Sequence, residues 1–79
     1  MSGVDSRERG AELIELIVNG EPRRVAAGIS VRGLVEEMGL AKAACAVEVN
    51  RGIVPRREHE ARVLAGGDVV EVVSLVGGG

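Results

Sequence analysis

The stretch that decides the fold is Asp68-Val69-Val70-Glu71-Val72-Val73-Ser74-Leu75-Val76, which continues directly into Gly77-Gly78-Gly79. Its β-branched residues predict a strand, whereas three consecutive glycines can adopt almost any backbone conformation. We therefore expect a rigid strand that ends in a flexible tail at residues 77–79. The tail has no side chains, so its one distinctive group is the terminal α-carboxylate of Gly79. This pattern favours a carrier whose own end reacts over a catalyst.

Length and composition exclude several classes of protein. A chain of 79 residues makes one small domain, which buries only about 60% of its unfolded surface. Aromatic residues are absent, so the core must be aliphatic and the chain offers no stacking platform for single-stranded nucleic acid. The net charge is -2, with acidic and basic residues interspersed, so nothing in the sequence resembles an electrostatic footprint for the phosphate backbone of DNA or RNA. We expect no nucleic-acid partner.

Cysteine and histidine usage points to a protein without a metal. One Cys and one His cannot form an internal disulfide or a zinc site with four protein ligands. No apolar run approaches the roughly 20 residues that span a bilayer, and the polar residues 1–11 lack the apolar region of a secretory signal. We predict a cytoplasmic protein without a membrane segment, in which residues 1–11 form a disordered extension.

Turn signals divide the first part of the chain into a hairpin and a helix. Asn19-Gly20 separates an apolar run, 12–18, from a weaker second arm, 22–27, and such a pair predicts a hairpin. A helix follows, because apolar residues recur at i, i+3, i+4 and i+7. Ser30 is its expected N-cap and Gly39 its expected end. The apolar face comprises Val31, Leu34, Val35 and Met38. Gly33 within it indicates either a close contact or a marginal helix.

The second part of the chain predicts three more elements. Residues 45–50 alternate and predict a half-buried strand with Cys45, Val47 and Val49 on one face. After a turn at 50–52 we expect a very short strand at 53–54 and a polar turn or single helical turn at 56–62. Together these elements predict an α+β layer, a small mixed sheet packed on one helix, over residues 12–76.

Few side chains are candidates for catalysis. Glu36 and Glu37 face away from the apolar stripe and are expected to be solvated. Cys45 is expected to be a small core residue, since no His or Lys lies near it in sequence. His59 has no Ser, Cys or Asp partners around it in sequence, which favours a surface histidine. We assign catalytic chemistry to none of them.

A docking surface is expected beside the tail. If Val70 and Val72 face the helix, Val73 and Leu75 are left partly exposed on the opposite phase. Exposed aliphatic residues next to a flexible end favour contact with a partner. We therefore assign partner docking to three residues: Val73, Leu75 and Val76.

Several short motifs in order resemble the bacterial sulfur carrier family of thiamine biosynthesis, ThiS. The resemblance covers the chain from about Leu13 to its end. The motifs are Val18-Asn19-Gly20-Glu21, Ala27-Gly28-Ile29-Ser30-Val31 with Leu34, Ala46-Val47-Glu48-Val49-Asn50, Ile53-Val54-Pro55-Arg56, Gly67-Asp68 and the terminal Gly-Gly.

The resemblance implies a fold and a chemistry. The fold is a ubiquitin-like β-grasp. The chain would bind no cofactor and would not itself be an enzyme. A ThiF-type adenylyltransferase would use ATP and Mg to activate the C-terminal carboxylate, a sulfur donor protein would supply sulfur, and a ThiG-type thiazole synthase would receive it. The family's terminal Gly-Gly falls on Gly78 and Gly79, with Gly79 carrying the sulfur as a thiocarboxylate, while Gly77 is an additional tail residue.

Two alternatives compete with this interpretation. The small subunit of molybdopterin synthase is similar in fold, size and terminal Gly-Gly, but usually carries a Phe-Pro-Pro-like stretch before the tail that residues 73–76 lack. The other is a β-grasp interaction module whose C-terminus takes part in no reaction. Such a module would tolerate a residue added after Gly79, whereas a carrier would not.

Overall fold

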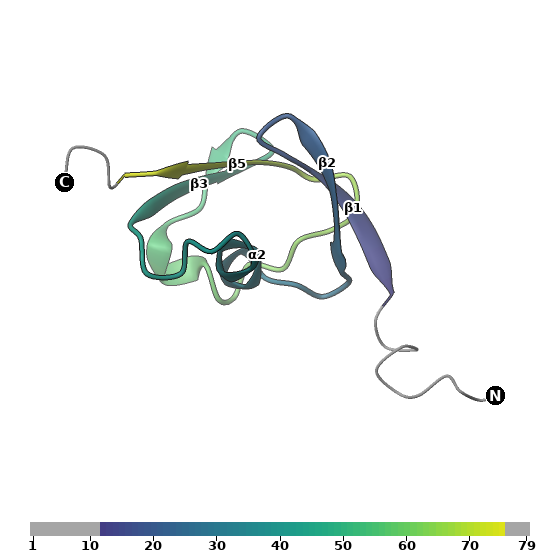
Figure 1. The fold of residues 1–79 in the computed structure, drawn as a ribbon, viewed down its shortest axis with the longest axis horizontal. Helices are drawn as coiled ribbons and strands as arrows, with labels where there is room; N and C mark the ends of the chain where they lie inside the picture. Colours follow the sequence, from purple (N-terminus) through teal and green to yellow (C-terminus); the bar gives the residue numbers. More distant parts are fainter. Residues whose placement is uncertain (1–11, 76–79) are drawn as a thin grey trace.

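One mixed sheet and one α-helix form the two layers of residues 12–75, the part of the chain that the computed structural model describes (Figure 1). In Figure 1 the sheet lies above the helix. The elements in order are β1 Leu13–Val18, β2 Glu21–Ala26, α2 Val31–Glu37, β3 Cys45–Val49, β4 Gly52–Ile53, the 3-10 helix η1 Arg56–Glu58 and β5 Val69–Ser74. The predictions for residues 1–11 and for the tail, 77–79, lie outside the described residues.

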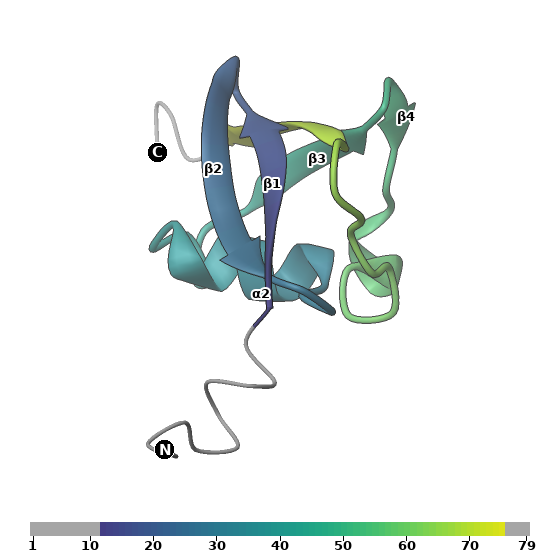
Figure 2. The same cartoon turned by 90° about the vertical axis from the view of Figure 1, so that its right-hand side faces the viewer.

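The last strand occupies the middle of the sheet. The strand order is β2-β1-β5-β3-β4, and β5 runs parallel to β1 and antiparallel to β3. Figure 2 shows β1 and β2 on one side of this arrangement and β3 and β4 on the other. The first and last strands of the domain are therefore neighbours.

Both tight turns of the sheet use residues with positive φ. Asn19 and Gly20 have φ values of 51° and 86° and connect the pair Val18↔Glu21, which confirms the predicted hairpin. Pro22 follows on β2, an edge strand, where a missing N–H is tolerated. Asn50 and Arg51, with φ values of 52° and 73°, make the second turn.

The helix begins and ends where the sequence predicts. The Ser30 side chain accepts a hydrogen bond from the backbone N–H of Gly33 at 3.0 Å, and Gly39 adopts a φ of 78° just after the last turn. A Cβ at Gly33 would lie 2.8 Å from Cγ1 of Ile29. The close contact, one of the two explanations that the sequence left open, therefore accounts for Gly33.

An aliphatic core fills the space between the sheet and α2. Val70 and Val72 of β5 are 0% and 6% exposed, which confirms the predicted phase of this strand. Leu34 of α2 is fully buried against them in the same cluster. The remaining buried members are Leu16, Val18, Val25, Val31, Val35, Val47, Val49, Val54 and Leu64. Within residues 12–75 no helix is long and apolar enough to cross a membrane.

One expectation for a side chain was wrong. His59 is 8% exposed rather than a surface residue, and its Nε2 lies 3.0 Å from the carbonyl oxygen of Val54. The 3-10 helix η1 ends at His59 and turns the ring inward. There the imidazole is a hydrogen-bond partner of the Val54 carbonyl oxygen, as expected for a buried polar group.

Strand limits also differ slightly from the predicted ones. Asp68 belongs to the turn before β5, where its carboxylate accepts a hydrogen bond from the backbone N–H of Ala65 at 2.8 Å. The predicted short strand at 53–54 is observed at Gly52–Ile53, because Gly52 pairs with Val49 directly after the turn.

Candidate functional site

The end of β5 is hydrogen-bonded to neighbouring backbone up to the last described residue. Cys45 of β3 pairs with Ser74, and the backbone N–H of Leu75 donates to the carbonyl oxygen of Ala44 at 2.7 Å. Figure 1 shows this end of the sheet projecting away from β1 and β2. The predicted reacting residue Gly79, the tail residues Gly77 and Gly78, and Val76 lie outside the described part of the chain. The structure thus shows the position of Leu75, the last described residue before them.

Two turn asparagines secure β5 along its length. Beyond the end of β1, Asn19 Nδ2 donates to the Val72 carbonyl at 3.2 Å and Asn19 Oδ1 accepts from the Val72 N–H at 2.8 Å. The amide side chain therefore continues the ladder where the β1 backbone has turned away. At the start of β5, Asn50 Oδ1 accepts from the N–H of Val69 at 2.9 Å. The sequence identified both residues as turn formers but gave no signal of these long-range contacts.

The outer face of the sheet, the face turned away from α2, carries exposed aliphatic side chains. Val73 is 54% exposed and Leu75 60%, which confirms the exposure expected from the alternation along β5. Val69, on the same phase, and Ile53 of β4 are also exposed, at 43% and 66%. The sequence analysis had not identified these last two as part of the surface. That this face docks a partner remains a prediction.

Two glutamates lie directly opposite each other on this surface. The antiparallel register of β3 and β5 places Glu48 opposite Glu71, in the row next to Ala46 and Val73. Neither carboxylate forms an ion pair or hydrogen bond with another described residue. Like charges directly opposite each other on a sheet are destabilising. Sequence alternation places each residue on this face, but only the strand register shows that they are opposite each other.

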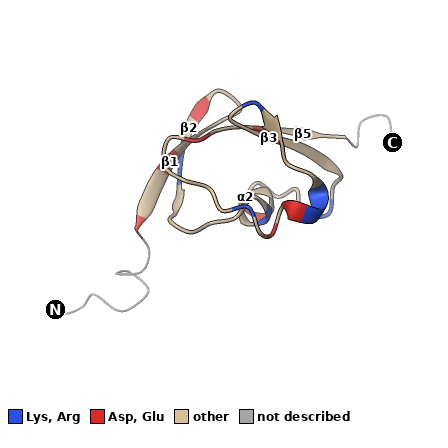
Figure 3. Ribbon diagram, turned by 180° about the vertical axis from the view of Figure 1, so that it is seen from behind, with Lys and Arg blue, Asp and Glu red and all other residues tan. Residues whose placement is uncertain are grey.

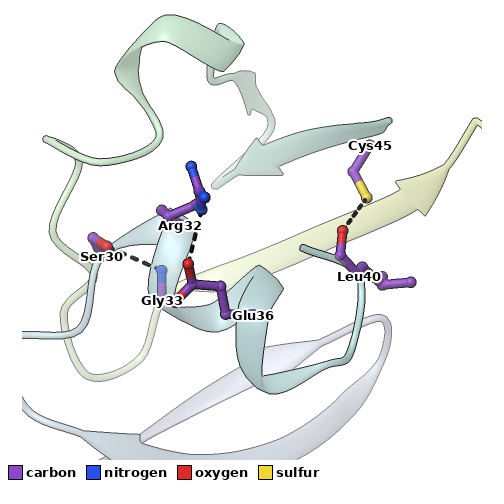
Figure 4. Close-up of polar contacts among 6 residues, drawn as sticks. All are labelled: Ser30, Arg32, Gly33, Glu36, Leu40 and Cys45. Carbon is purple, nitrogen blue, oxygen red and sulfur yellow. Dashed lines mark hydrogen bonds and ion pairs between the residues drawn. The ribbon is translucent and has the colours of Figure 1, made fainter. Parts of the chain in front are cut away.

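A shallow hollow of about 550 Å³ lies on the other side of the molecule, between α2 and η1. Cys45 and His59 both line it, together with the basic side chains Arg32, Arg56 and Arg57. The Cys45 sulfur faces the carbonyl oxygen of Leu40 at 3.9 Å, as Figure 4 shows, while the His59 ring bonds to a backbone carbonyl. Figure 3 shows acidic and basic segments side by side at η1. The polar contacts of Cys45 and His59 do not join them as a nucleophile and its base.

The helix carboxylates have ordinary surface roles. Glu36 pairs with Arg32 at 3.0 Å (Figure 4), and Glu37 pairs with Arg23 at 3.4 Å. These exposed pairs confirm that the two glutamates are solvated. No group of three or more His, Cys, Asp or Glu residues between 12 and 75 could hold a metal ion.

The arrangement as a whole defines a class of protein. A small mixed sheet with a parallel pair of first and last strands, folded over one helix, is a ubiquitin-like β-grasp domain. Its distinctive surface is the outer face of the sheet at the end of β5. Within that class the chain belongs to the ThiS family, whose model matches residues 16–79.

Individual relatives agree with this assignment. The chain is 42% identical over 62 residues to the sulfur carrier protein ThiS of Thermus thermophilus, covering 78% of this chain and 95% of that protein. It is 36% identical over 66 residues to a thiazole synthase of Paramagnetospirillum magneticum. This match covers 84% of the chain, which spans only 20% of that longer protein. The crystal structure of the thiamine biosynthesis protein ThiS from Geobacter metallireducens superposes with a TM-score of 0.71 at 33% identity, covering 84% and 100% of the two chains.

Proposed function

We propose that this chain is a sulfur carrier for thiazole formation in thiamine biosynthesis, and that the carboxylate of Gly79 is converted to a thiocarboxylate. The observation that carries the proposal is that the family match runs through Gly79, directly beyond a strand held in the middle of the sheet. A rigid β5 followed by glycines 77–79 suits insertion into the narrow active site of a partner enzyme.

The chemistry requires activation from outside the chain. An α-carboxyl group is ionised at neutral pH and is a poor electrophile. An oxygen of the Gly79 carboxylate would attack the α-phosphate of ATP and displace pyrophosphate. The terminal sulfur of a persulfide on the donor would then attack the carbonyl carbon, and AMP would leave. A thiol would cleave the S–S bond of the resulting acyl disulfide, which releases the Gly79 thiocarboxylate and leaves a disulfide between the donor and that thiol. Neither Gly79 nor the preceding glycines has a side chain to obstruct these attacks.

The partners follow from that chemistry. A ThiF-type adenylyltransferase would bind ATP and Mg and form the adenylate, and a sulfur donor protein would supply the nucleophile. A ThiG-type thiazole synthase would be the acceptor. The similarity to a segment of a longer thiazole synthase supports this last assignment. The chain itself would be a co-substrate that binds no cofactor, and we place it in the cytoplasm.

Mass spectrometry of the C-terminal peptide tests the proposal. The chain is incubated with the cognate adenylyltransferase, ATP, Mg and a sulfur source, and is then cleaved after Arg62. The released peptide, 63–79, contains no Met or Cys, so oxidation of methionine, which adds nearly the same mass, cannot imitate the product. We expect one oxygen of Gly79 to be replaced by sulfur, located by fragmentation.

A variant with one alanine added after Gly79 is the matched control. It keeps the folded domain but moves the α-carboxylate off Gly79, so it should remain unmodified at this position. An unmodified peptide from the wild-type chain under the same conditions would refute the carrier function. Full biological activity of the extended variant would instead favour an interaction module without tail chemistry.

A further inference from the structure

We propose that the outer face of the sheet docks the adenylyltransferase through a basic side chain of that enzyme, which lies between Glu48 and Glu71. The proposal rests on the proposed function, since it places the enzyme that receives Gly79 against this face. It adds the charge of the contact and names the two residues that select the partner.

The first argument is that the carboxylates of Glu48 and Glu71 form no ion pair with another described residue. Directly opposite residues on neighbouring antiparallel strands have Cβ atoms about 4.5–5.5 Å apart, so the carboxylates of Glu48 and Glu71 repel each other across the ladder. Neither meets a cation of the described chain, because the described ion pairs lie at Arg23 and Arg32. One guanidinium or ammonium group from a partner could contact both carboxylates and remove the repulsion.

The second argument is the apolar surface on either side of these carboxylates. Along β5, Glu71 lies between Val69 and Val73, and Leu75 follows on the same phase. Across the sheet, Ile53 pairs with Glu48. A partner surface that carries a basic side chain flanked by apolar side chains would be complementary to this pattern. Apolar burial around the ion pair would also exclude water and strengthen its attraction.

The third argument is the short reach of the tail. Four residues, 76–79, separate Leu75 from the proposed reacting carboxylate, and a fully extended chain spans at most about 3.6 Å per residue. The enzyme groups that hold Gly79 must therefore lie within roughly 14 Å of Leu75. An enzyme body that close lies near the projecting end of β5, where Val73 and Leu75 are the exposed aliphatic residues.

The carboxylates would also restrict the choice of partner. A surface that presents an acidic group to Glu48 and Glu71 would add a third negative charge to a place that already carries two. Such repulsion is a common source of specificity between similar partners. An apolar patch alone would bind many apolar surfaces, whereas this one selects a partner with a basic side chain.

The test compares the double variant Glu48→Gln/Glu71→Gln with Glu58→Gln. Glu58 is an exposed carboxylate of η1, on the helix side of the molecule, and Gln keeps the size and polarity of Glu in every case. Binding to the cognate adenylyltransferase is measured by calorimetry without ATP, at low and high salt. Stability is measured by urea unfolding followed by circular dichroism.

We expect the double variant to bind about tenfold more weakly at low salt, with a flatter salt dependence. It should also unfold at a higher urea concentration, because the repulsion between strands is gone. Glu58→Gln should match the wild-type chain in affinity. A gain in stability together with a loss of binding is a result that damage to the fold cannot produce.

The outcomes separate this inference from the proposed function. Wild-type affinity in the double variant, an equal loss in Glu58→Gln, or no binding by the wild-type chain overturns the docking proposal. If the wild-type peptide 63–79 gains sulfur while the double variant binds normally, the carrier function stands alone. If the double variant binds weakly while wild-type Gly79 stays unmodified, the docking proposal stands alone.

Discussion

Replacing Asn19 should show how much of the stability of β5 depends on one side chain. Asn19 makes two hydrogen bonds to the backbone of Val72, at 2.8 and 3.2 Å, across 53 positions of sequence. It also adopts a φ of 51°, which Gly and Asn tolerate better than Ala. Three variants separate these contributions: Asn19→Gly, Asn19→Ala and Asn19→Asp.

The expected losses follow from the contacts removed. Asn19→Gly keeps the turn but removes both hydrogen bonds, which should cost about 1–3 kcal/mol because each contributes about 0.5–1.5. Asn19→Ala removes them and adds about 1–2 kcal/mol for the left-handed backbone. Asn19→Asp keeps an acceptor for the Val72 N–H but sets a second carboxylate oxygen against the Val72 carbonyl oxygen, so it should also be less stable than the wild-type chain. The whole domain is expected to have only about 4–12 kcal/mol of stability, so these losses are large.

Urea unfolding followed by far-ultraviolet circular dichroism measures these differences, since the chain has no Trp or Tyr for fluorescence. Hydrogen exchange at the Val72 amide gives a local check and should accelerate in Asn19→Gly. The reasoning fails if Asn19→Gly is as stable as the wild-type chain, or if Asn19→Ala is no less stable than Asn19→Gly.

The same unfolding assay checks three further predictions. His59→Leu should cost about 1–3 kcal/mol, because the Val54 carbonyl loses its partner in a buried place, and a cost near zero would refute the structural role of the ring. Ser30→Ala should cost about 1 kcal/mol because it removes the N-cap hydrogen bond to the Gly33 N–H. Ser30→Asp should retain most of the stability, because Asp is also a preferred N-cap residue. Equal losses in the two variants would contradict the capping role of Ser30. Leu34→Ala should cost about 2–5 kcal/mol because the Leu34 side chain is fully buried. The Leu13 side chain is 59% exposed, so Leu13→Ala should change stability by less than about 0.5 kcal/mol. Similar losses in the two variants would show that burial is not the cause.

Local signals in the sequence predicted most of the elements. The Asn19-Gly20 turn, the Ser30 cap and the inward phase of Val70 and Val72 depend on neighbouring residues only, and all three were confirmed. His59 was predicted wrongly because its burial depends on the path of η1 and on the Val54 carbonyl, five residues earlier. The polar residues next to His59 in sequence therefore do not indicate whether its imidazole ring is buried or exposed.

The surface beside the tail was predictable only in part. Alternation along β5 predicted the exposure of Val73 and Leu75. The meeting of Glu48 and Glu71 required the register between β3 and β5, strands separated by about 20 residues. The same holds for Asn19 and Val72, whose contact depends on the parallel pairing of β1 with β5. A single sequence does not show the register between strands that are far apart along the chain.

The place of β5 in the sheet has a consequence for how the protein is made. The strands at positions 13–18 and 69–74 must pair in parallel before the middle of the sheet exists, so a growing chain on the ribosome cannot complete this core until residues 69–74 have emerged. A product shortened within β5 would lose the central strand and the glycines together. Such a copy would not fold, because the buried residues Val70 and Val72 of the core would be missing.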